Sequence, residues 1–242
     1  MKIRLFTIPN MLTLANLLSG AIAVIVTLQY HNYTLALGLV VLAALFDFLD
    51  GFMARLLHQQ SPLGVQLDSL ADDVTFGLVP ALVMFDMYGA SASYYGCGCA
   101  CGGGVMEYLG YMTLLIAAFS VLRLAKFNID TTQSTEFSGL PTPANALLLL
   151  SVAMLCQKGY IALYQEHILL LSVAMSLLLI SPIRMFALKF KGFGWSGNEL
   201  RYTFLLVSAL IIAFMPVYSV TIIITLYIVV STLKWLFSKR EN

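Results

Sequence analysis

The sequence predicts an all-α protein that crosses a membrane several times, a polytopic helical bundle of six to eight transmembrane helices. Of its 242 residues, 60% are hydrophobic and only 10% are charged, and the mean hydropathy is +0.89. Soluble domains carry about 25% charged residues, so this chain has too few charges to cover a globule in water. Several apolar runs approach the roughly 20 residues that cross a bilayer as a helix. The runs are continuous, whereas strands of a transmembrane β-barrel alternate polar and apolar residues.

Eight apolar segments follow one another along the chain, and we expect each to form a helix. They span residues 11–29, 34–56, 63–85, 107–126, 142–157, 166–188, 201–215 and 217–237. The fifth and seventh are short for a membrane span, so the prediction is six to eight spans. Pro216 separates the last two, because proline cannot continue a helix without losing a hydrogen bond. The first segment continues without a cleavage pattern, so we interpret it as a span rather than a signal peptide.

The positions of lysine and arginine predict the orientation, since cytoplasmic loops are enriched in these residues. With eight spans and a cytoplasmic N-terminus, only Lys158 of the 13 basic residues falls on the opposite side. We therefore expect both termini in the cytoplasm and the protein in an inner (cytoplasmic) membrane of the bacterial type. The net charge of +1 gives no basic field of the kind that binds nucleic acid.

Three of the four cysteines, Cys97, Cys99 and Cys101, lie in a glycine-rich segment on the predicted outer side. Zinc ligands usually come as Cys-x-x-Cys pairs, and a spacing of two residues does not fit that pattern. We interpret the segment as a flexible connecting loop. A metal or disulfide role for it stays open.

Four aspartates lie at matched depth in the second and third segments, although an ionised residue in a span costs about 2.5–3.5 kcal/mol. Asp47 and Asp50 are three residues apart, so they share a helix face. Asp68 and Asp72 are four residues apart and share another. A short turn joins the two helices, which makes them antiparallel neighbours whose carboxylates converge. Asp73 points about 100° away from Asp72, and we give it no role in the site.

The residue types around this point predict metal and phosphate chemistry. Oxygen ligands suit hard divalent cations such as Mg²⁺ or Mn²⁺, and two such ions can stabilise the charge of a reacting phosphoryl group. Gly51 and Gly64 indicate that a ligand or a backbone comes close, since glycine weakens a helix. Arg55 lies near the membrane surface, where its guanidinium can bind phosphate. The structural alternatives are that the charged residues hold helices together, or that Asp50 and Arg55 form a plain ion pair. For four aspartates on two facing surfaces, either would leave roughly half of the charges unpaired.

These residues form one pattern, Asp47-x-x-Asp50-Gly51-x-x-Ala54-Arg55, then eight residues, then Gly64-x-x-x-Asp68-x-x-x-Asp72. The pattern resembles the signature of the CDP-alcohol phosphotransferases at every fixed position. The stretches 8–20, 67–81, 123–128 and 137–146 are similar to the phosphatidylserine synthase branch of that family, so the resemblance covers about the first 150 residues. Two positions depart from the branch, Phe52 where many members have a basic residue and Thr75 where many have serine.

The resemblance implies a CDP-alcohol phosphotransferase fold. Residues 1–242 would form a single membrane domain, with a catalytic core at about 8–146 and C-terminal helices at about 147–238. The implied reaction transfers the phosphatidyl group of CDP-diacylglycerol to L-serine and releases CMP at a cytoplasm-facing site. The implied cofactor is a divalent metal, Mg²⁺ or Mn²⁺, as two ions. Membrane lipid would surround the protein, and a homodimer is expected because homodimers are common in the family.

The same resemblance assigns residues to roles. The metal ions would be bound by Asp47, Asp50, Asp68 and Asp72, and Asp72 would also be the general base. The residues expected to bind CDP-diacylglycerol are Pro9, Asn10, Gly51, Arg55, Ser61 and Gly64. The residues expected near serine are Arg123, Lys126, Asn128 and Thr142. Arg123 and Lys126 can equally be anchors that reach the lipid headgroups on the cytoplasmic side.

Two other functions remain open from the sequence. One is the same chemistry with glycerol 3-phosphate or an inositol phosphate as the acceptor, which would require a denser basic cluster. The other is a cation transporter with the aspartates as its ion path. A transporter would spread its carboxylates through the membrane, whereas these gather toward one face beside Arg55, which opposes the passage of cations.

Overall fold

The computed structural model describes residues 5–94, 108–129, 136–186 and 198–240. The segment with Cys97, Cys99 and Cys101 lies outside these ranges, as do the basic residues Lys2, Arg4, Lys189 and Lys191. The described elements are, in chain order, α1 (Ile8–Tyr30), α2 (Tyr33–Leu56), α3 (Pro62–Asp72), η1 (Asp73–Leu78), α4 (Val79–Tyr94), η2 (Gly110–Leu114), α6 (Leu115–Ile129), β1 (Glu136–Ser138), α7 (Thr142–Gln157), α8 (Gln165–Ile180), β2 (Arg184–Phe186), α9 (Glu199–Phe214) and α10 (Ser219–Arg240). The predicted all-α class is confirmed. Its small exception is the antiparallel pair of β1 with β2.

Most of the described helices are suited to a bilayer. Five helical segments are long and apolar enough to cross a membrane: Ile8–Tyr30, Tyr33–Leu56, Pro62–Ser91, Gly110–Ile129 and Ser219–Phe237. Two shorter apolar helices, α7 and α8, add to them. The chain is therefore an integral membrane protein, and these seven segments fall within the predicted range of six to eight spans.

Side-chain caps set helix ends that hydropathy alone leaves open. Thr7 caps α1 by accepting a hydrogen bond from the Asn10 N–H (3.4 Å). At the other end of α1, His31 adopts the left-handed conformation with φ 47°. Asn32 then caps α2 by accepting from the Leu35 N–H (3.0 Å). The first two helices are thus joined by a two-residue turn and form a tight hairpin.

Two predicted segments differ from the structure. The sixth segment was predicted to reach residue 188, but α8 ends at Ile180. Ser181 is extended there, with φ −62° and ψ 152°, because the residue before a proline is disfavoured in the helical conformation and Pro182 has no N–H to donate. The third segment was predicted over 63–85, but helix continues from Pro62 to Tyr94 with a π-helical stretch, η1, in the middle.

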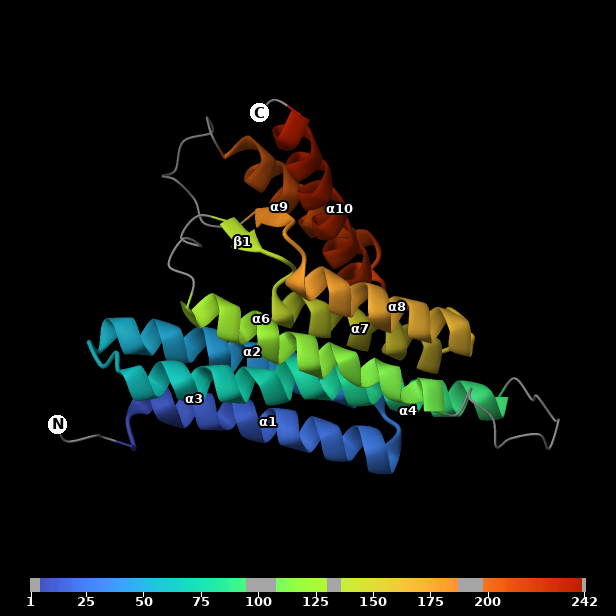
Figure 1. The fold of residues 1–242 in the computed structure, drawn as a ribbon, viewed down its shortest axis with the longest axis horizontal. Coiled ribbons are helices and arrows are strands. Elements are labelled where there is room, and N and C mark those ends of the chain that lie inside the picture. Colours follow the sequence, from blue (N-terminus) through green and yellow to red (C-terminus); the bar gives the residue numbers. More distant parts are fainter. Residues whose placement is uncertain (1–4, 95–107, 130–135, 187–197, 241–242) are drawn as a thin grey trace.

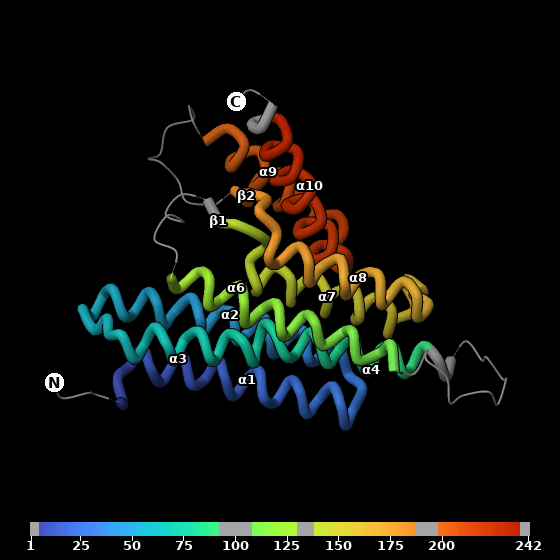
Figure 2. Tube along the Cα trace, viewed as in Figure 1, coloured from blue at the N-terminus to red at the C-terminus, as the bar shows by residue number. Residues whose placement is uncertain are grey.

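The helices form a layered bundle. Figure 1 and Figure 2 show α1, α2, α6 and the continuous run of α3 and α4 lying along the length of the molecule. α7 and α8 pack against this layer, and α9 and α10 rise away from it at a steep angle. The core is filled by fully buried residues of several helices, such as Val40, Phe76, Met84 and Leu149.

α1 and η1 approach each other closely at Gly20. A Cβ at Gly20 would meet the Thr75 side chain and lie 3.0 Å from the Thr75 Cα. The buried Thr75 hydroxyl donates to the Asn16 carbonyl (3.3 Å). Thr75, where many members of the phosphatidylserine synthase branch have serine, therefore takes part in a helix-packing contact. The other departure, Phe52, is 45% exposed, and its ring stacks on Phe48 with 6.5 Å between centroids.

Candidate metal centre and adjoining pocket

The turn between α2 and α3 brings the two halves of the aspartate pattern together. α2 ends at Leu56, and His58 adopts the left-handed conformation with φ 51°. The Ser61 hydroxyl accepts a hydrogen bond from the Gly64 N–H (3.1 Å) and caps α3, whose first turn holds Pro62. The chain therefore reverses within a few residues, as the sequence predicted. α1 packs against both helices of this hairpin.

Three carboxylates meet inside the hairpin. Asp47, Asp50 and Asp68 each offer an oxygen atom, and these atoms all lie within 4.8 Å of one another. Asp50 is buried, and the other two are partly buried. Asp68 Oδ1 is buried without a hydrogen-bond partner. Within the described ranges, no lysine or arginine forms an ion pair with the three carboxylates, so the alternative pairing of Asp50 with Arg55 is not seen.

This donor set fits a hard divalent cation. Ionised carboxylates accept hydrogen bonds but donate none, so three of them at this spacing repel one another unless a positive charge compensates. Oxygen ligands of this kind suit Mg²⁺, Mn²⁺ or Ca²⁺ rather than soft metals. The three residues can therefore hold a metal ion, in agreement with the sequence pattern.

Asp72, the fourth predicted metal ligand, stands beside this group rather than within it. It is buried, and its Oδ1 accepts a hydrogen bond from Asn16 Nδ2 (3.1 Å). It interacts electrostatically with Asp47 and Asp68. Asp72 lies next to the cluster, and one of its oxygens is hydrogen-bonded to α1. This placement is compatible with a role as a metal ligand or as the general base.

α1 contributes a polar face that the sequence analysis did not identify beyond Asn10. Thr13 Oγ1 donates to Asp50 Oδ2 (2.5 Å), and Asn16 donates to Asp72. Asn10, Thr13 and Asn16 are all buried and are spaced three residues apart. Polar residues at that spacing on an otherwise apolar helix mark a common face, and this signal was available in the sequence.

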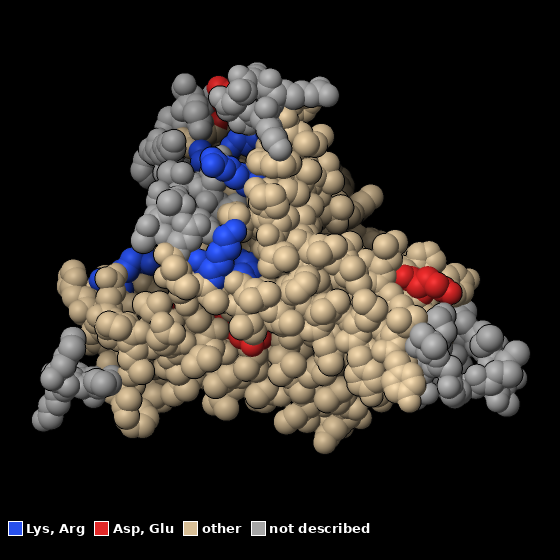
Figure 3. All heavy atoms as spheres, viewed as in Figure 1, with Lys and Arg blue, Asp and Glu red and all other residues tan. Residues whose placement is uncertain are grey.

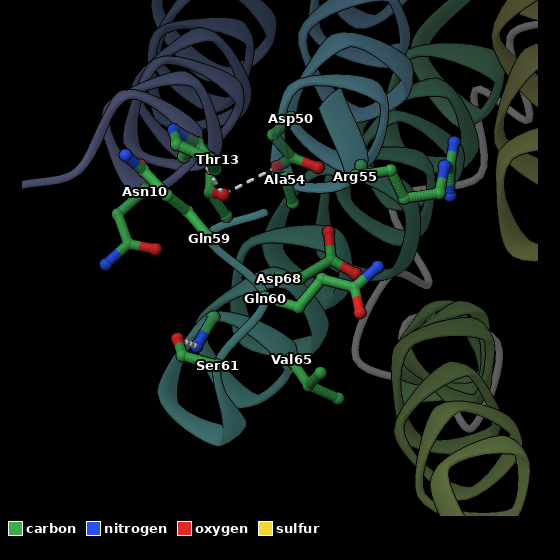
Figure 4. A pocket seen from close by; sticks show the side chains of 13 residues that line it. Asn10, Thr13, Asp50, Ala54, Arg55, Gln59, Gln60, Ser61, Val65 and Asp68 are labelled. Atoms are coloured by element: carbon green, nitrogen blue, oxygen red, sulfur yellow. Dashed lines mark hydrogen bonds between the residues drawn. The ribbon is translucent and has the colours of Figure 1, made fainter. Parts of the chain in front are cut away.

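A partly open pocket of about 250 Å³ adjoins the carboxylates. All six residues predicted to bind CDP-diacylglycerol line it: Pro9, Asn10, Gly51, Arg55, Ser61 and Gly64. Asp50 and Asp68 line it too, and Figure 4 shows both side chains reaching the same space from α2 and α3, with Arg55 at its edge.

Two glutamines of the turn belong to the pocket and were not predicted. Gln59 and Gln60 line it together with Ser61 (Figure 4). Their amides can both donate and accept hydrogen bonds, which suits a polar ligand. The sequence offered no periodicity to single them out, because they lie in a turn.

The residues predicted near serine fall into two groups. Arg123 and Thr142 lie together, with Arg123 Nη1 3.4 Å from Thr142 Oγ1. Arg123 is partly buried, sits over the Phe127 ring at 5.5 Å from its centroid, and interacts electrostatically with Asp72. The guanidinium of Arg123 is therefore partly enclosed, with Thr142 and Phe127 beside it.

Lys126 and Asn128 have different surroundings. Both are exposed. Lys126 Nζ lies 3.4 Å from Ser138 Oγ, and Asn128 Nδ2 donates to Ser69 Oγ (2.8 Å). Asn128 thus links the end of α6 to α3, and the structure does not bring these two residues together with Arg123 and Thr142.

Comparison with known proteins gives a consistent match. Residues 6–178 match the family model described as CDP-alcohol phosphatidyltransferase. The chain is 29% identical to the CDP-diacylglycerol–serine O-phosphatidyltransferase of Helicobacter pylori over 237 residues, which cover 96% of this chain and 92% of that protein. A protein of the same name from Bacillus subtilis is 35% identical over 136 residues, 56% of this chain and 69% of that protein. Another from Methanocaldococcus jannaschii is 29% identical over 185 residues, 75% of this chain and 74% of that protein.

Proposed function

The chain belongs to the CDP-alcohol phosphatidyltransferase family, as its sequence pattern predicted, and we propose that it transfers the phosphatidyl group of CDP-diacylglycerol to L-serine. The observation that carries the proposal is that three aspartates gather within 4.8 Å and a pocket borders two of them. Serine is the favoured acceptor because it appears in the names of the similar proteins. The products would be phosphatidylserine and CMP.

The proposed cofactor is a divalent cation, Mg²⁺ or Mn²⁺, bound as two ions. Asp47, Asp50 and Asp68 would hold it together with Asp72. A bound divalent ion would supply positive charge next to the phosphoryl oxygens and the departing CMP.

The protein residues would position the substrates and move one proton. Arg55 and the polar groups of the pocket would hold the diphosphate. Asp72 would accept the proton of the serine hydroxyl while the serine oxygen bonds to the phosphorus that carries the diacylglycerol. The bond from that phosphorus to the bridging oxygen breaks, and CMP leaves with the electron pair. Asn16, which donates to Asp72, would hold the base in orientation, because phosphoryl transfer depends mainly on positioning and electrostatics.

The position of the site relative to the membrane is part of the proposal. CMP and serine are water-soluble, so the pocket has to open toward an aqueous side. The basic residues support the cytoplasmic side and two cytoplasmic termini in a bacterial-type inner membrane. In the view of Figure 3 the surface is largely uncharged, and Lys and Arg lie away from the end where α4 finishes and α8 begins.

Two structural expectations are proposals as well. The chain would be a single membrane domain, whose catalytic core at 8–146 falls within the matched range 6–178. The functional unit would be a homodimer. Chemical crosslinking of the protein in native membranes would give a band at twice the monomer mass, and a band at the monomer mass alone would contradict the dimer.

The direct test is CMP release by purified full-length protein in detergent micelles with CDP-diacylglycerol. L-serine, glycerol 3-phosphate, an inositol phosphate and no acceptor would be compared, each with Mn²⁺, with Mg²⁺ and with EDTA. Asp72→Asn is the matched variant, since it keeps the size of the side chain and removes the base.

Release that needs both serine and metal, and that Asp72→Asn abolishes, is the expected result. CMP release with another acceptor in place of serine would support phosphatidyl transfer but contradict serine as the acceptor. No release with any acceptor from folded protein would contradict the proposed catalysis. In that case, the uptake of divalent cations into vesicles that contain the protein would test the transporter alternative.

A further inference from the structure

Three polar side chains with buried, unpaired atoms have no part in the chemistry described above. Within the part of the chain that the structure describes, six buried side-chain atoms lack a hydrogen-bond partner. Two of them belong to Asn16 and Asp68 at the carboxylates. The other four are Asp73 Oδ1, Ser120 Oγ and both amide atoms of Asn145. Unpaired polar atoms at membrane depth are costly, so these atoms indicate a polar ligand.

Asp73 of η1 and Ser120 of α6 both pack closely against Gly77 of η1. A Cβ at Gly77 would lie 2.6 Å from Asp73 Oδ1 and 2.9 Å from Ser120 Oγ. Both oxygens therefore point at the position where any residue other than glycine would carry a side chain. Ser120 is fully buried and Asp73 partly buried. A carboxylate with a hydroxyl is a good partner for a cationic donor such as an ammonium group.

A group of opposite charge lies one turn away on α6. Arg123 follows Ser120 by three residues and shares its helix face. Arg123 also interacts electrostatically with Asp72, the proposed base. A partner for an ammonium group and a partner for a carboxylate thus lie about one helical turn apart, beside the residue that would accept the hydroxyl proton.

Asn145 adds a further polar group. It lies three residues after Thr142 on α7, on the same helix face, and both residues are fully buried. Thr142 contacts Arg123, at 3.4 Å between Nη1 and Oγ1. The amide of Asn145 offers one donor group and one acceptor, which can bind a carboxylate or an ammonium group.

We propose that Asp73 and Ser120 bind the ammonium group of the acceptor, and that Arg123, assisted by Asn145, binds its carboxylate. The inference rests on the proposed phosphatidyl transfer and identifies what makes the acceptor a hydroxyamino acid. An α-amino acid carries both charges on one carbon and matches the neighbouring positions of Asp73 and Arg123. Glycerol 3-phosphate and inositol phosphates carry only negative charge, which an unpaired carboxylate disfavours.

The experiment measures KM for L-serine and for CDP-diacylglycerol in the full-length protein and its variants. Asp73→Asn should raise KM for serine by about 10- to 100-fold, the effect of losing a hydrogen bond to a charged group, with KM for CDP-diacylglycerol unchanged. Ser120→Ala should raise KM for serine by about 3- to 10-fold. 3-Hydroxypropionate is serine without its ammonium group. In Asp73→Asn, the ratio of its inhibition constant to the KM for serine should fall, because the lost carboxylate no longer favours the ammonium group.

Two matched variants control for general effects. Asp86→Asn changes a carboxylate of α4 that pairs with His31 at 2.8 Å. Ser172→Ala changes a buried serine of α8 that donates to its own helix at Ile168 (2.7 Å). Both should leave KM for serine unchanged.

Each outcome decides between the two proposals. Unmodified protein that uses glycerol 3-phosphate and not serine would overturn the proposed function. Unmodified protein that uses serine, with KM for serine and the 3-hydroxypropionate response unchanged in the variants, would overturn this inference alone. An equal loss in the control variants would also overturn it. If Asp73→Asn fails to fold, Ser120→Ala decides by itself.

Discussion

Replacing Thr13 by valine tests whether α1 is part of the metal centre. Thr13 Oγ1 donates to Asp50 Oδ2 over 2.5 Å, and both residues are buried. Valine nearly keeps the shape of the threonine side chain but removes the donor. Asp50 would then lose its link to α1 while the packing of the helix is largely retained.

The expected magnitude follows from the type of bond. A hydrogen bond to a charged group contributes about 1.5–3 kcal/mol, and 1.4 kcal/mol corresponds to a factor of ten. Loss of a partner that orients a metal ligand typically costs about 10- to 100-fold in metal affinity or activity. We expect Thr13→Val to raise the Mn²⁺ concentration for half-maximal CMP release by about 10-fold.

The assay is a Mn²⁺ titration of CMP release at saturating CDP-diacylglycerol and serine. Thr27→Val is the matched control, because Thr27 is a buried threonine of the same helix whose hydroxyl donates to the Ala23 carbonyl (2.9 Å). Superimposable metal titrations of Thr13→Val and Thr27→Val would refute the participation of α1 in the metal centre.

Two further changes test helix packing and the pocket. Gly20→Ala should lower the melting temperature of the purified protein, because its Cβ would lie 3.0 Å from the Thr75 Cα and overpacking costs about 1–3 kcal/mol. Gly38→Ala is the control, since a Cβ there meets nothing within 4 Å, and equal melting temperatures of the two variants would contradict the close approach. Arg55→Lys should raise KM for CDP-diacylglycerol about 10-fold, because an ammonium group cannot bind phosphate bidentately. An unchanged KM, as expected for the control Lys158→Ala, would remove Arg55 from substrate binding.

Composition and hydropathy determined the class of the protein and the approximate helix positions, because a membrane span needs about 20 apolar residues whatever its neighbours are. The fifth predicted segment coincides with α7, Thr142–Gln157. The sixth does not, since the apolar residues after Pro182 form β2 instead of helix. Apolar character alone does not distinguish a short buried strand from the end of a helix.

The aspartate pattern was readable from the sequence because its geometry is local. A spacing of three or four residues fixes a common helix face, and one short turn sets α3 against α2. The structure gathers Asp47, Asp50 and Asp68 within 4.8 Å, which that spacing predicts, and places Asp72 beside them. The predicted roles of the pocket residues and of Arg123 stay predictions until the assays above are done.

Hydropathy and the spacing of the aspartates were therefore enough to predict a polytopic membrane protein, its family and a carboxylate cluster in the hairpin of α2 and α3. The packing of the helices then showed that α1 supports this cluster through Thr13 and Asn16, and that Asp73 and Ser120 both lie against Gly77. Thr13 and Asp50 are 37 residues apart in the chain, and Asn16 and Asp72 are 56 apart. Such contacts depend on how whole helices pack and rotate against each other, which the periodicity within one helix does not encode.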